Sequence, residues 1–167
     1  MADIGNYLNL GPLVMVVDDD PVSRKFLQVT LKRSGYGSVV CESGVEALNL
    51  LYEYAPIVVI CDYDMPEMNG IDFFLQARTL KPYLRGILHS GAVDYAVLTD
   101  AVEGGFDDCL LKPIRPKELY ASLQRSTMMA KHWRGRYEEL GEGGAATEGT
   151  PGAVGLPGVP KVPGTGA

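Results

Sequence analysis

Four aspartates lie directly after two short apolar runs in this sequence. Asp18 and Asp19 follow the first run, and Asp62 and Asp64 follow the second. Burying a charge without a partner is costly, so carboxylates in such places face a ligand rather than a hydrophobic core. Crowded carboxylates raise one another's pKa unless a cation lies among them. Hard oxygen ligands without a nearby Cys or His pair favour Mg²⁺, which leaves room for a substrate phosphate.

Two further polar residues, Ser90 and Lys112, end apolar runs later in the chain. Because the C-terminal ends of parallel strands share one edge of a sheet, we expect both residues to meet the aspartates there. A divalent ion, a lysine and a hydroxyl around a carboxylate suit a phosphoryl group, whose transfer needs positioning and charge neutralisation. A carboxylate in this place can also be the nucleophile and form an aspartyl phosphate. His89, inside its apolar run, is expected to be a core or strand-end histidine.

Five short apolar runs alternate with five helical stretches. Runs of this length, β-branched and without alternation, are typical of strands buried on both faces. The pattern predicts an α/β fold, a small doubly wound parallel sheet with helices on both faces. The expected strands are Leu13–Val17, Ser38–Cys41, Ile57–Cys61, Gly86–His89 and Cys109–Leu111, and the expected helices are Pro21–Ser34 with Asp20 as its N-cap, 44–55, Gly70–Leu80, Ala92–Val102 and Pro116 to about Leu140.

The first helix carries apolar residues on two sides. Val22, Phe26 and Val29 share one side, and Leu27 and Leu31 share the other. A helix of this kind is expected to be covered by more than a single sheet face.

Composition limits the class of protein. The chain has 167 residues and a net charge of −6, and 46% of its residues are hydrophobic, which is enough for a core. The negative charge argues against a surface for nucleic acid or anionic membrane. No run approaches the length of a membrane span, and the N-terminus lacks the pattern of a signal peptide. Cys41, Cys61 and Cys109 are odd in number and lie in apolar runs, which indicates reduced core thiols in a cytoplasmic protein.

The chain divides into four expected segments. Residues 1–11 form an N-terminal extension, 12–127 the α/β domain, 128–140 an extension of the last helix, and 141–167 a stretch rich in glycine and proline. The last stretch has no aromatic residue and cannot bury a core, so it is expected to be a flexible tail or linker.

Four motifs carry a resemblance to a known family. They are VVDDDP at 16–21, CDYDMPEMNG at 61–70, Ser90-Gly91, and GGFDDCLLKPI at 104–114. Together they resemble the receiver domain of two-component response regulators over residues 12–127. The resemblance implies a flavodoxin-like sheet with strand order 2-1-3-4-5. It also implies self-phosphorylation and self-dephosphorylation rather than turnover of an external substrate.

The resemblance implies a role for each acidic residue. Asp62 would accept a phosphoryl group from a phosphohistidine on a sensor histidine kinase or a histidine phosphotransfer protein. Asp19 and Asp62 would bind Mg²⁺ through their side chains. Asp64 would contribute its backbone carbonyl, and Asp18 would act through water or through Lys112.

The resemblance also implies a switch. Ser90 would hydrogen-bond the phosphoryl group as its loop moves inward, and Lys112 would pair with the same group, followed by Pro113 in a cis peptide bond. The change would be read out on the face made by the fourth helix, fifth strand and fifth helix. Cys109 stands where the family often has an aromatic ring that swings inward, so this part of the switch departs from the family pattern. Asp64 occupies a position whose residue type varies within the family. A carboxylate there does not indicate whether the phosphoryl lifetime is lengthened or shortened.

The last helix supports two interpretations. Its apolar and small residues recur at alternating spacings of four and three, as in a heptad seam. The helix is either a coiled coil that pairs a homodimer or leads into an output domain, or a helix whose first half packs on its own domain and whose second half frays. Gly135 lowers helix stability by about 1 kcal/mol relative to alanine. The seam positions are Leu119, Leu123, Ser126, Ala130, Trp133, Tyr137 and Leu140.

Three functions follow from these residues. The leading one is a phosphorylation-controlled, Mg²⁺-dependent signalling module that switches a partner protein or an output domain, without direct contact with nucleic acid. The second is a phosphatase of the haloacid dehalogenase type, with Asp62 and Asp64 as nucleophile and acid, although its nucleophile strand should come first in the chain. The third is a receiver-like scaffold that takes no phosphate. Turnover of an external phosphate monoester would distinguish the phosphatase.

Overall fold

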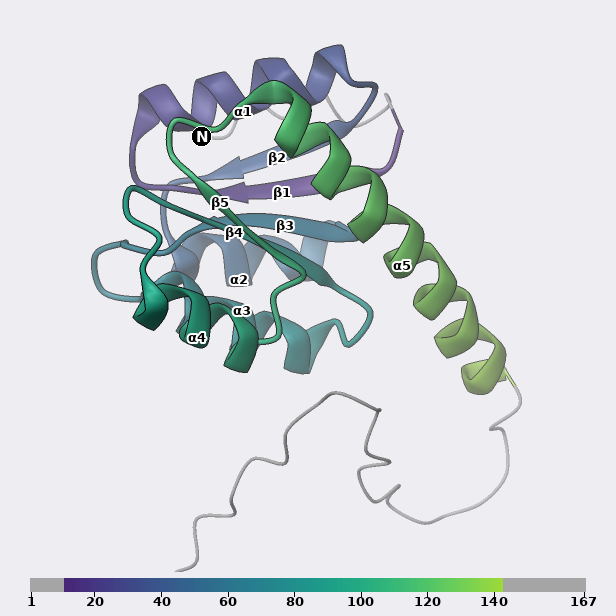
Figure 1. The fold of residues 1–167 in the computed structure, drawn as a ribbon. Helices are drawn as coiled ribbons and strands as arrows, with labels where there is room; N and C mark the ends of the chain where they lie inside the picture. Colours follow the sequence, from purple (N-terminus) through teal and green to yellow (C-terminus); the bar gives the residue numbers. More distant parts are fainter. Residues whose placement is uncertain (1–10, 143–167) are drawn as a thin grey trace, which may run out of the picture.

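A five-stranded parallel sheet forms the centre of the molecule. The computed structural model describes residues 11–142; the parts of the expected N-terminal extension and Gly/Pro-rich stretch at 1–10 and 143–167 lie outside them. The strand order is β2-β1-β3-β4-β5 (Figure 1), which confirms the expected doubly wound fold and the implied order. The strands are β1 Leu13–Val17, β2 Gly37–Cys41, β3 Val58–Asp62, β4 Arg85–Ser90 and β5 Asp108–Leu111.

The helices lie in two layers. Helices α1 and α5 cover one face of the sheet, and α2, α3 and α4 cover the other (Figure 1). Between residues 11 and 142, no helix is both long and apolar enough to cross a membrane. The helices are α1 Pro21–Arg33, α2 Gly44–Glu53, α3 Gly70–Leu80, α4 Tyr95–Glu103 and α5 Pro116–Glu142.

Strand β1 shows why the strands are apolar throughout. Val14 and Val16 lie in the core cluster shared with α1 and α5, whereas Met15 and Val17 lie in the cluster shared with α2 and α3. All four side chains are fully buried. A central parallel strand must bury both faces, and each such side chain contributes about 1.5–3 kcal/mol when it leaves water.

A side chain caps the N-terminus of each of the first four helices. As predicted, Asp20 caps α1, because its carboxylate accepts two backbone N–H groups of the first turn. Asp94 caps α4 by accepting the N–H of Val97 at 3.0 Å. Helix α4 therefore begins at Tyr95, and the expected start at Ala92 is wrong. Apolar periodicity did not locate this boundary, because the residues before the cap are also apolar.

The expectation that both sides of α1 are covered is wrong. Leu27 and Leu31 are fully buried against the sheet, but Val22 is 74% exposed and Phe26 is 42% exposed. Helix α5 begins beside this side of α1 and then crosses β4 and β3, so it leaves the outer apolar side open. We call this open surface the α1 groove; it is lined by Pro21, Val22, Lys25, Phe26, Val29, Thr30, Arg33 and Pro116.

The first half of α5 belongs to the core of its own domain. Leu119, Leu123 and Ala130 lie in the same cluster as the strands, and Ser126 is buried beside them. These four seam positions therefore pack within the chain and are not available to a coiled-coil partner. The interpretation in which the first half packs on its own domain is confirmed.

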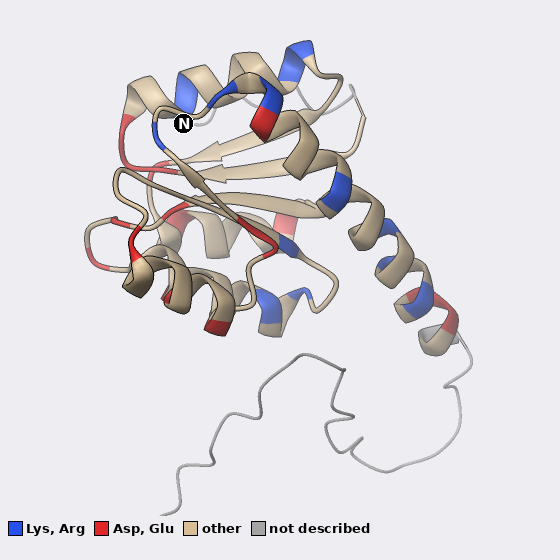
Figure 2. Cartoon of the chain, in the orientation of Figure 1, with Lys and Arg blue, Asp and Glu red and all other residues tan. Residues whose placement is uncertain are grey.

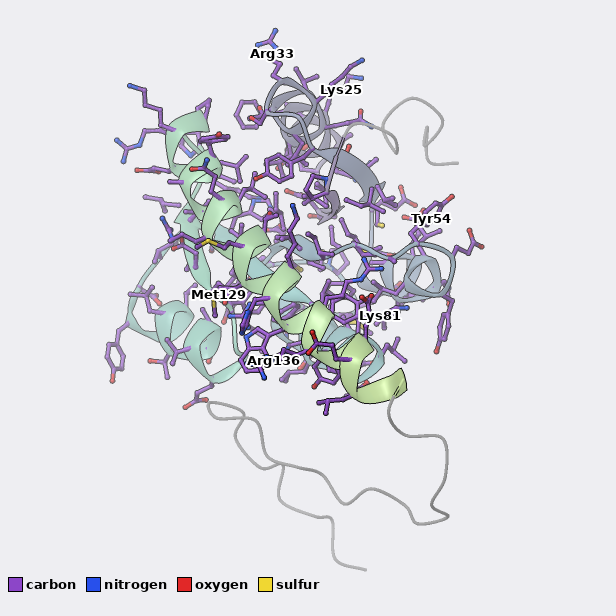
Figure 3. The ribbon with its side chains drawn as sticks, turned by 90° about the vertical axis from the view of Figure 1, so that its right-hand side faces the viewer. Lys25, Arg33, Tyr54, Lys81, Met129 and Arg136 are labelled. Carbon is purple, nitrogen blue, oxygen red and sulfur yellow. The ribbon has the colours of Figure 1, made fainter. Side chains whose placement is uncertain are left out.

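The second half of α5 does not fray. The helix continues through Gly135 without a break to its end at residue 142. Arg134 fastens it: the guanidinium lies 5.7 Å from the ring centroid of Tyr83 and pairs with Glu138 at 2.8 Å. Figure 3 shows α5 crossing this side of the molecule, with Met129 labelled on it. The helix therefore runs as one piece past the end of the sheet.

Candidate functional site

Three aspartates lie together at the C-terminal edge of the sheet. One carboxylate oxygen from each of Asp18, Asp19 and Asp62 lies within 4.8 Å of the other two. The ammonium of Lys112 lies between two of them, 3.1 Å from Asp62 Oδ1 and 3.2 Å from Asp18 Oδ2. Figure 2 shows acidic residues gathered where β1 and β3 end. Of the residues expected at this edge, the side chains of Asp18, Asp19, Asp62 and Lys112 meet there.

Asp18 is fully buried, and its carboxylate oxygens are engaged by the protein. The N–H of Asp20 donates to Oδ1 at 2.8 Å, and Ser23 Oγ donates to Oδ2 at 2.5 Å. Burial raises the pKa of Asp18, but the two hydrogen bonds, with the charges around it, outweigh burial, so the pKa is lowered. With Lys112 also bonded to Oδ2, this carboxylate fits an indirect contact with an ion, as the resemblance implied.

Arg24 fixes the backbone of the acidic loop, a contact that sequence reasoning missed. Its Nη1 donates to the carbonyl of Asp18 at 2.7 Å and to the carbonyl of Asp19 at 3.0 Å. The other end of the guanidinium lies 4.0 Å from Glu42, the residue directly after β2. Asp19 keeps an exposed side chain, because the loop is held through its backbone. Only the position of Arg24 in the first turns of α1 could have suggested the contact.

Asp62 is the less satisfied of the two buried carboxylates. It is 5% exposed, and Lys112 is the donor to its carboxylate among the described residues. The pKa of Asp62 is raised to about 6. Burial makes the largest contribution, Lys112 opposes it, and the charges of Asp18 and Asp19 add to it. The side chain is thus ionised at neutral pH but more basic than an ordinary aspartate.

Ser90 and Lys112 reach the site from neighbouring strands. Ser90 Oγ donates to the carbonyl of Ala92 at 2.7 Å, so the hydroxyl is bonded within its own loop and not to Asp62. The N–H of Lys112 donates to the carbonyl of Ser90 at 2.8 Å, which ties the two strand ends together. The peptide bond from Lys112 to Pro113 is cis, as the resemblance implied.

Two of the expected site residues lie outside the cluster. The side chain of Asp64 is exposed and does not join the three aspartates. Cys109 is half-buried and packs against a small cluster that contains Leu88 and Val97. Burial and the neighbouring Asp108 raise the pKa of its thiol, so the sulfur stays protonated at neutral pH.

Tyr63 and His89 also belong to the site and were not assigned to it from the sequence. The hydroxyl of Tyr63 donates to Asp100 at 2.6 Å, which links the loop after Asp62 to α4 and raises the pKa of the phenol to about 12. His89 is fully buried, with Nε2 3.4 Å from Asp18 Oδ2. Strand alternation places His89 on the side that faces α1 and α5, but it does not reveal which group the ring meets.

The comparison with protein families decides the identity of this site. The model of the response regulator receiver domain matches residues 14–124. The chain belongs to this family. Members accept phosphoryl groups and generally bind Mg²⁺ at the acidic site. The receiver resemblance drawn from the four motifs is thereby confirmed.

The relatives show how much of a larger protein this receiver covers. The DNA-binding response regulator MtrA of Mycolicibacterium smegmatis is 34% identical over 113 residues, which are 66% of this chain and 48% of that protein. The Regulator of RpoS of Escherichia coli is 28% identical over 130 residues, 78% of this chain and 39% of that protein. The solved structure of chemotaxis protein CheY4 of Vibrio cholerae superposes with a TM-score of 0.66 at 26% identity and covers 69% of this chain and 98% of CheY4. The chain thus spans about half or less of the length of these curated relatives.

Proposed function

We propose that this receiver accepts a phosphoryl group on Asp62 from a phosphohistidine of a sensor histidine kinase or a histidine phosphotransfer protein. One observation carries the proposal. Asp62 is a buried carboxylate of raised pKa at the end of β3, and its Oδ1 lies 3.1 Å from the Lys112 ammonium beside Asp18 and Asp19. A basic oxygen next to a fixed positive charge suits attack on phosphorus.

The transfer exchanges one bond to phosphorus for another. A carboxylate oxygen of Asp62 attacks the phosphorus, the P–N bond of the phosphohistidine breaks, and the electron pair returns to the imidazole nitrogen of the donor. The product on Asp62 is an acyl phosphate. Lys112 then pairs with the added negative charge, and Ser90 Oγ leaves the carbonyl of Ala92 to donate to a phosphoryl oxygen.

The residues at the site fit Mg²⁺. Asp18, Asp19 and Asp62 together with Lys112 leave two negative charges, and all the ligand atoms among the aspartates are hard oxygens. Asp19, Asp62 and the backbone carbonyl of Asp64 would hold the ion directly, and Asp18 would act through water. When bound, the ion supplies charge neutralisation at the phosphoryl oxygens.

The α1 groove lies beside the site and suits the protein that donates the phosphoryl group. Its apolar floor, with Val22 and Phe26, is rimmed by Lys25 and Arg33. Phe26→Glu is expected to slow transfer from a phosphorylated histidine phosphotransfer domain about tenfold, because it places a charge in the apolar contact. Uptake from acetyl phosphate should stay unchanged. Tyr52→Glu, at an exposed aromatic on α2, is the matched control, and an equal loss in that variant would contradict this docking surface.

The readout is proposed for the opposite side of the site. Tyr95 of α4 is 87% exposed and Leu111 of β5 is 53% exposed, which gives the α4–β5–α5 face apolar contacts for a partner protein or an output domain. We propose no direct contact of this receiver with nucleic acid. Homodimer formation through α5 is limited to Trp133, Tyr137 and Leu140, the seam positions that the domain leaves partly or fully exposed.

Two further parts of the proposal concern chemistry and location. We propose a phosphoacceptor that phosphorylates and dephosphorylates itself, rather than an enzyme that turns over an external substrate. Cys41, Cys61 and Cys109 are all free thiols, which supports a reducing compartment such as the cytoplasm.

Intact-mass measurement after incubation with Mg²⁺ and acetyl phosphate tests the proposal. Wild-type protein should gain one phosphoryl group, and Asp62→Asn should gain none, because it lacks the nucleophilic oxygen pair. A wild-type protein that gains no mass, or an Asp62→Asn variant that gains the same mass, would contradict the proposal. Sustained turnover of p-nitrophenyl phosphate would instead favour the phosphatase.

A further inference from the structure

His89 is a buried polar side chain that the proposed chemistry does not yet use. It lies on β4 in direct register with Asp62 on β3 and is fully buried. Neither ring nitrogen has a hydrogen-bond partner among the described residues. A buried polar group without a partner lowers stability, and an apolar side chain in its place would avoid this. The reason for a histidine at this position is therefore sought in the groups near its ring.

The ring of His89 faces a carboxylate and an ammonium. Nε2 lies 3.4 Å from Asp18 Oδ2, and the Lys112 ammonium is bonded to the same oxygen. Whether neutral or protonated, an imidazole can carry a hydrogen on the nitrogen nearest a carboxylate. His89 can thus donate to Asp18.

Lys112 is shared between two carboxylates. Its Nζ lies 3.2 Å from Asp18 Oδ2 and 3.1 Å from Asp62 Oδ1. A phosphoryl group on Asp62 adds negative charge at Asp62 and draws the ammonium to that side. Asp18 then loses the donor that balances it, although it stays buried. Ser23 Oγ is already bonded to Asp18, so among the described residues it cannot replace the lysine.

We propose that His89 is a positioning residue for phosphoryl transfer: its Nε2–H holds the Asp18 carboxylate when Lys112 turns to the phosphoryl group on Asp62. This inference rests on the proposed function of Asp62. Nε2 lies 3.4 Å from Asp18 Oδ2 without the geometry of a hydrogen bond in the resting state, and a small shift of either group makes the bond. The unpaired ring is then the cost of a donor that is needed only in the phosphorylated state.

Two substitutions separate this role from simple filling of the core. His89→Leu introduces an apolar side chain of similar volume and removes the donor. His89→Gln keeps an N–H donor at a distance from the backbone similar to that of Nε2. Binding of beryllofluoride with Mg²⁺, measured by titration calorimetry, reports the phosphoryl-like state, and binding of Mg²⁺ alone reports the resting state. Thermal unfolding reports the structural effect of each change.

The expected pattern is specific to the phosphoryl-like state. His89→Leu should weaken beryllofluoride binding about tenfold, the size of one hydrogen bond to a charged group, and leave Mg²⁺ binding within about twofold. His89→Gln should restore most of the beryllofluoride affinity. His89→Leu should unfold at the same temperature as wild type or higher, because an unpaired polar group has been removed.

A background without Lys112 gives an independent measurement. In Lys112→Met, Asp18 has lost its ammonium in the resting state, so His89 must already hold it. Adding His89→Leu to this background should weaken Mg²⁺ binding about fivefold, in contrast to its small effect in wild type. Equal effects of His89→Leu in the two backgrounds would overturn the inference.

Other outcomes also decide between the claims. Wild-type beryllofluoride affinity in His89→Leu, or an equal loss in His89→Leu and His89→Gln, would show that the ring only fills space. Failure of wild-type protein to bind beryllofluoride, or unchanged binding in Asp62→Asn, would overturn the proposed function and this inference together. The wild-type and Asp62→Asn measurements thus distinguish the two failures.

Discussion

The ends of β1 and β3 each carry a buried aspartate, yet the two carboxylates differ in what holds them. Asp18 receives a backbone N–H, the Ser23 hydroxyl and the Lys112 ammonium, and its pKa is lowered. Asp62 receives only the shared ammonium among the described residues, and its pKa is raised to about 6. The difference fits the roles proposed for them: the satisfied carboxylate would anchor the lysine, and the unsatisfied one would supply the nucleophilic oxygen.

The largest expected effect comes from removing the charge at each strand end in turn. Asp18→Asn should lower the free energy of unfolding by about 3 kcal/mol, because an amide N–H₂ replaces an acceptor among donors that remain buried. Asp62→Asn should leave stability unchanged or raise it, because a buried and poorly satisfied charge disappears. Urea unfolding of wild type and both variants near neutral pH measures the two changes in the free energy of unfolding. Equal destabilisation by the two substitutions would erase the contrast.

The pH dependence of stability gives the next largest effect. Folded Asp62 binds its proton more tightly than the unfolded chain, whose ordinary aspartate pKa is 3.8. Between about pH 4 and about pH 6 the folded state therefore holds more protons at this site, and its contribution to stability falls as pH rises. Relative to Asp62→Asn, wild type should lose on the order of 2 kcal/mol across this window.

Asp18 should behave in the opposite sense. Its folded pKa lies below 3.8, so its contribution is present above that pH and is lost as pH falls through the lowered pKa. Unfolding curves of wild type, Asp18→Asn and Asp62→Asn, measured from below pH 3.8 up to about pH 6, separate the contributions of the two carboxylates to stability. A wild type whose stability relative to Asp62→Asn does not change between pH 4 and pH 6 would contradict the raised pKa.

The smallest expected effect tests the loop that presents Asp18 and Asp19. Arg24→Gln removes the hydrogen bonds to both carbonyls and should lower stability by about 1 kcal/mol and weaken Mg²⁺ binding several-fold. Arg33→Gln, at an exposed end of the same helix, is the matched control and should change stability by less than about 0.5 kcal/mol. Calorimetric Mg²⁺ titrations that show no difference between the two variants would remove Arg24 from the site.

The sequence was sufficient for the parts of the site that follow from strand ends. Asp18, Asp62 and Lys112 each stop an apolar run, and parallel topology then brings them to one edge. The contacts of Arg24 and His89 did not follow in this way. They depend on how α1 packs against the sheet and on how far β4 lies from β1 across β3, and neither periodicity nor residue type encodes those distances.

The helices show the same limit. The spacing along α5 fits a coiled-coil seam and a helix packed on its own sheet equally well, because both bury a stripe of similar period. Only the burial of Leu123 and Ala130 against the sheet decides between them. On α1, the apolar side with Phe26 looked like core, but the path of α5 leaves it open. The hydrophobic pattern therefore identified the apolar faces of these helices, but it did not show which element, if any, packs against each face.

Chemical mapping of the phosphorylated residue tests the central contrast most directly. Receiver protein treated with Mg²⁺ and acetyl phosphate is reduced with borohydride, which converts an acyl phosphate to an alcohol, and the modified residue is located by peptide mass spectrometry. The account predicts modification at Asp62 alone, because it is the buried carboxylate that combines a raised pKa with a single protein donor, the Lys112 ammonium, among the described residues. Modification at Asp18 or Asp19 would contradict it.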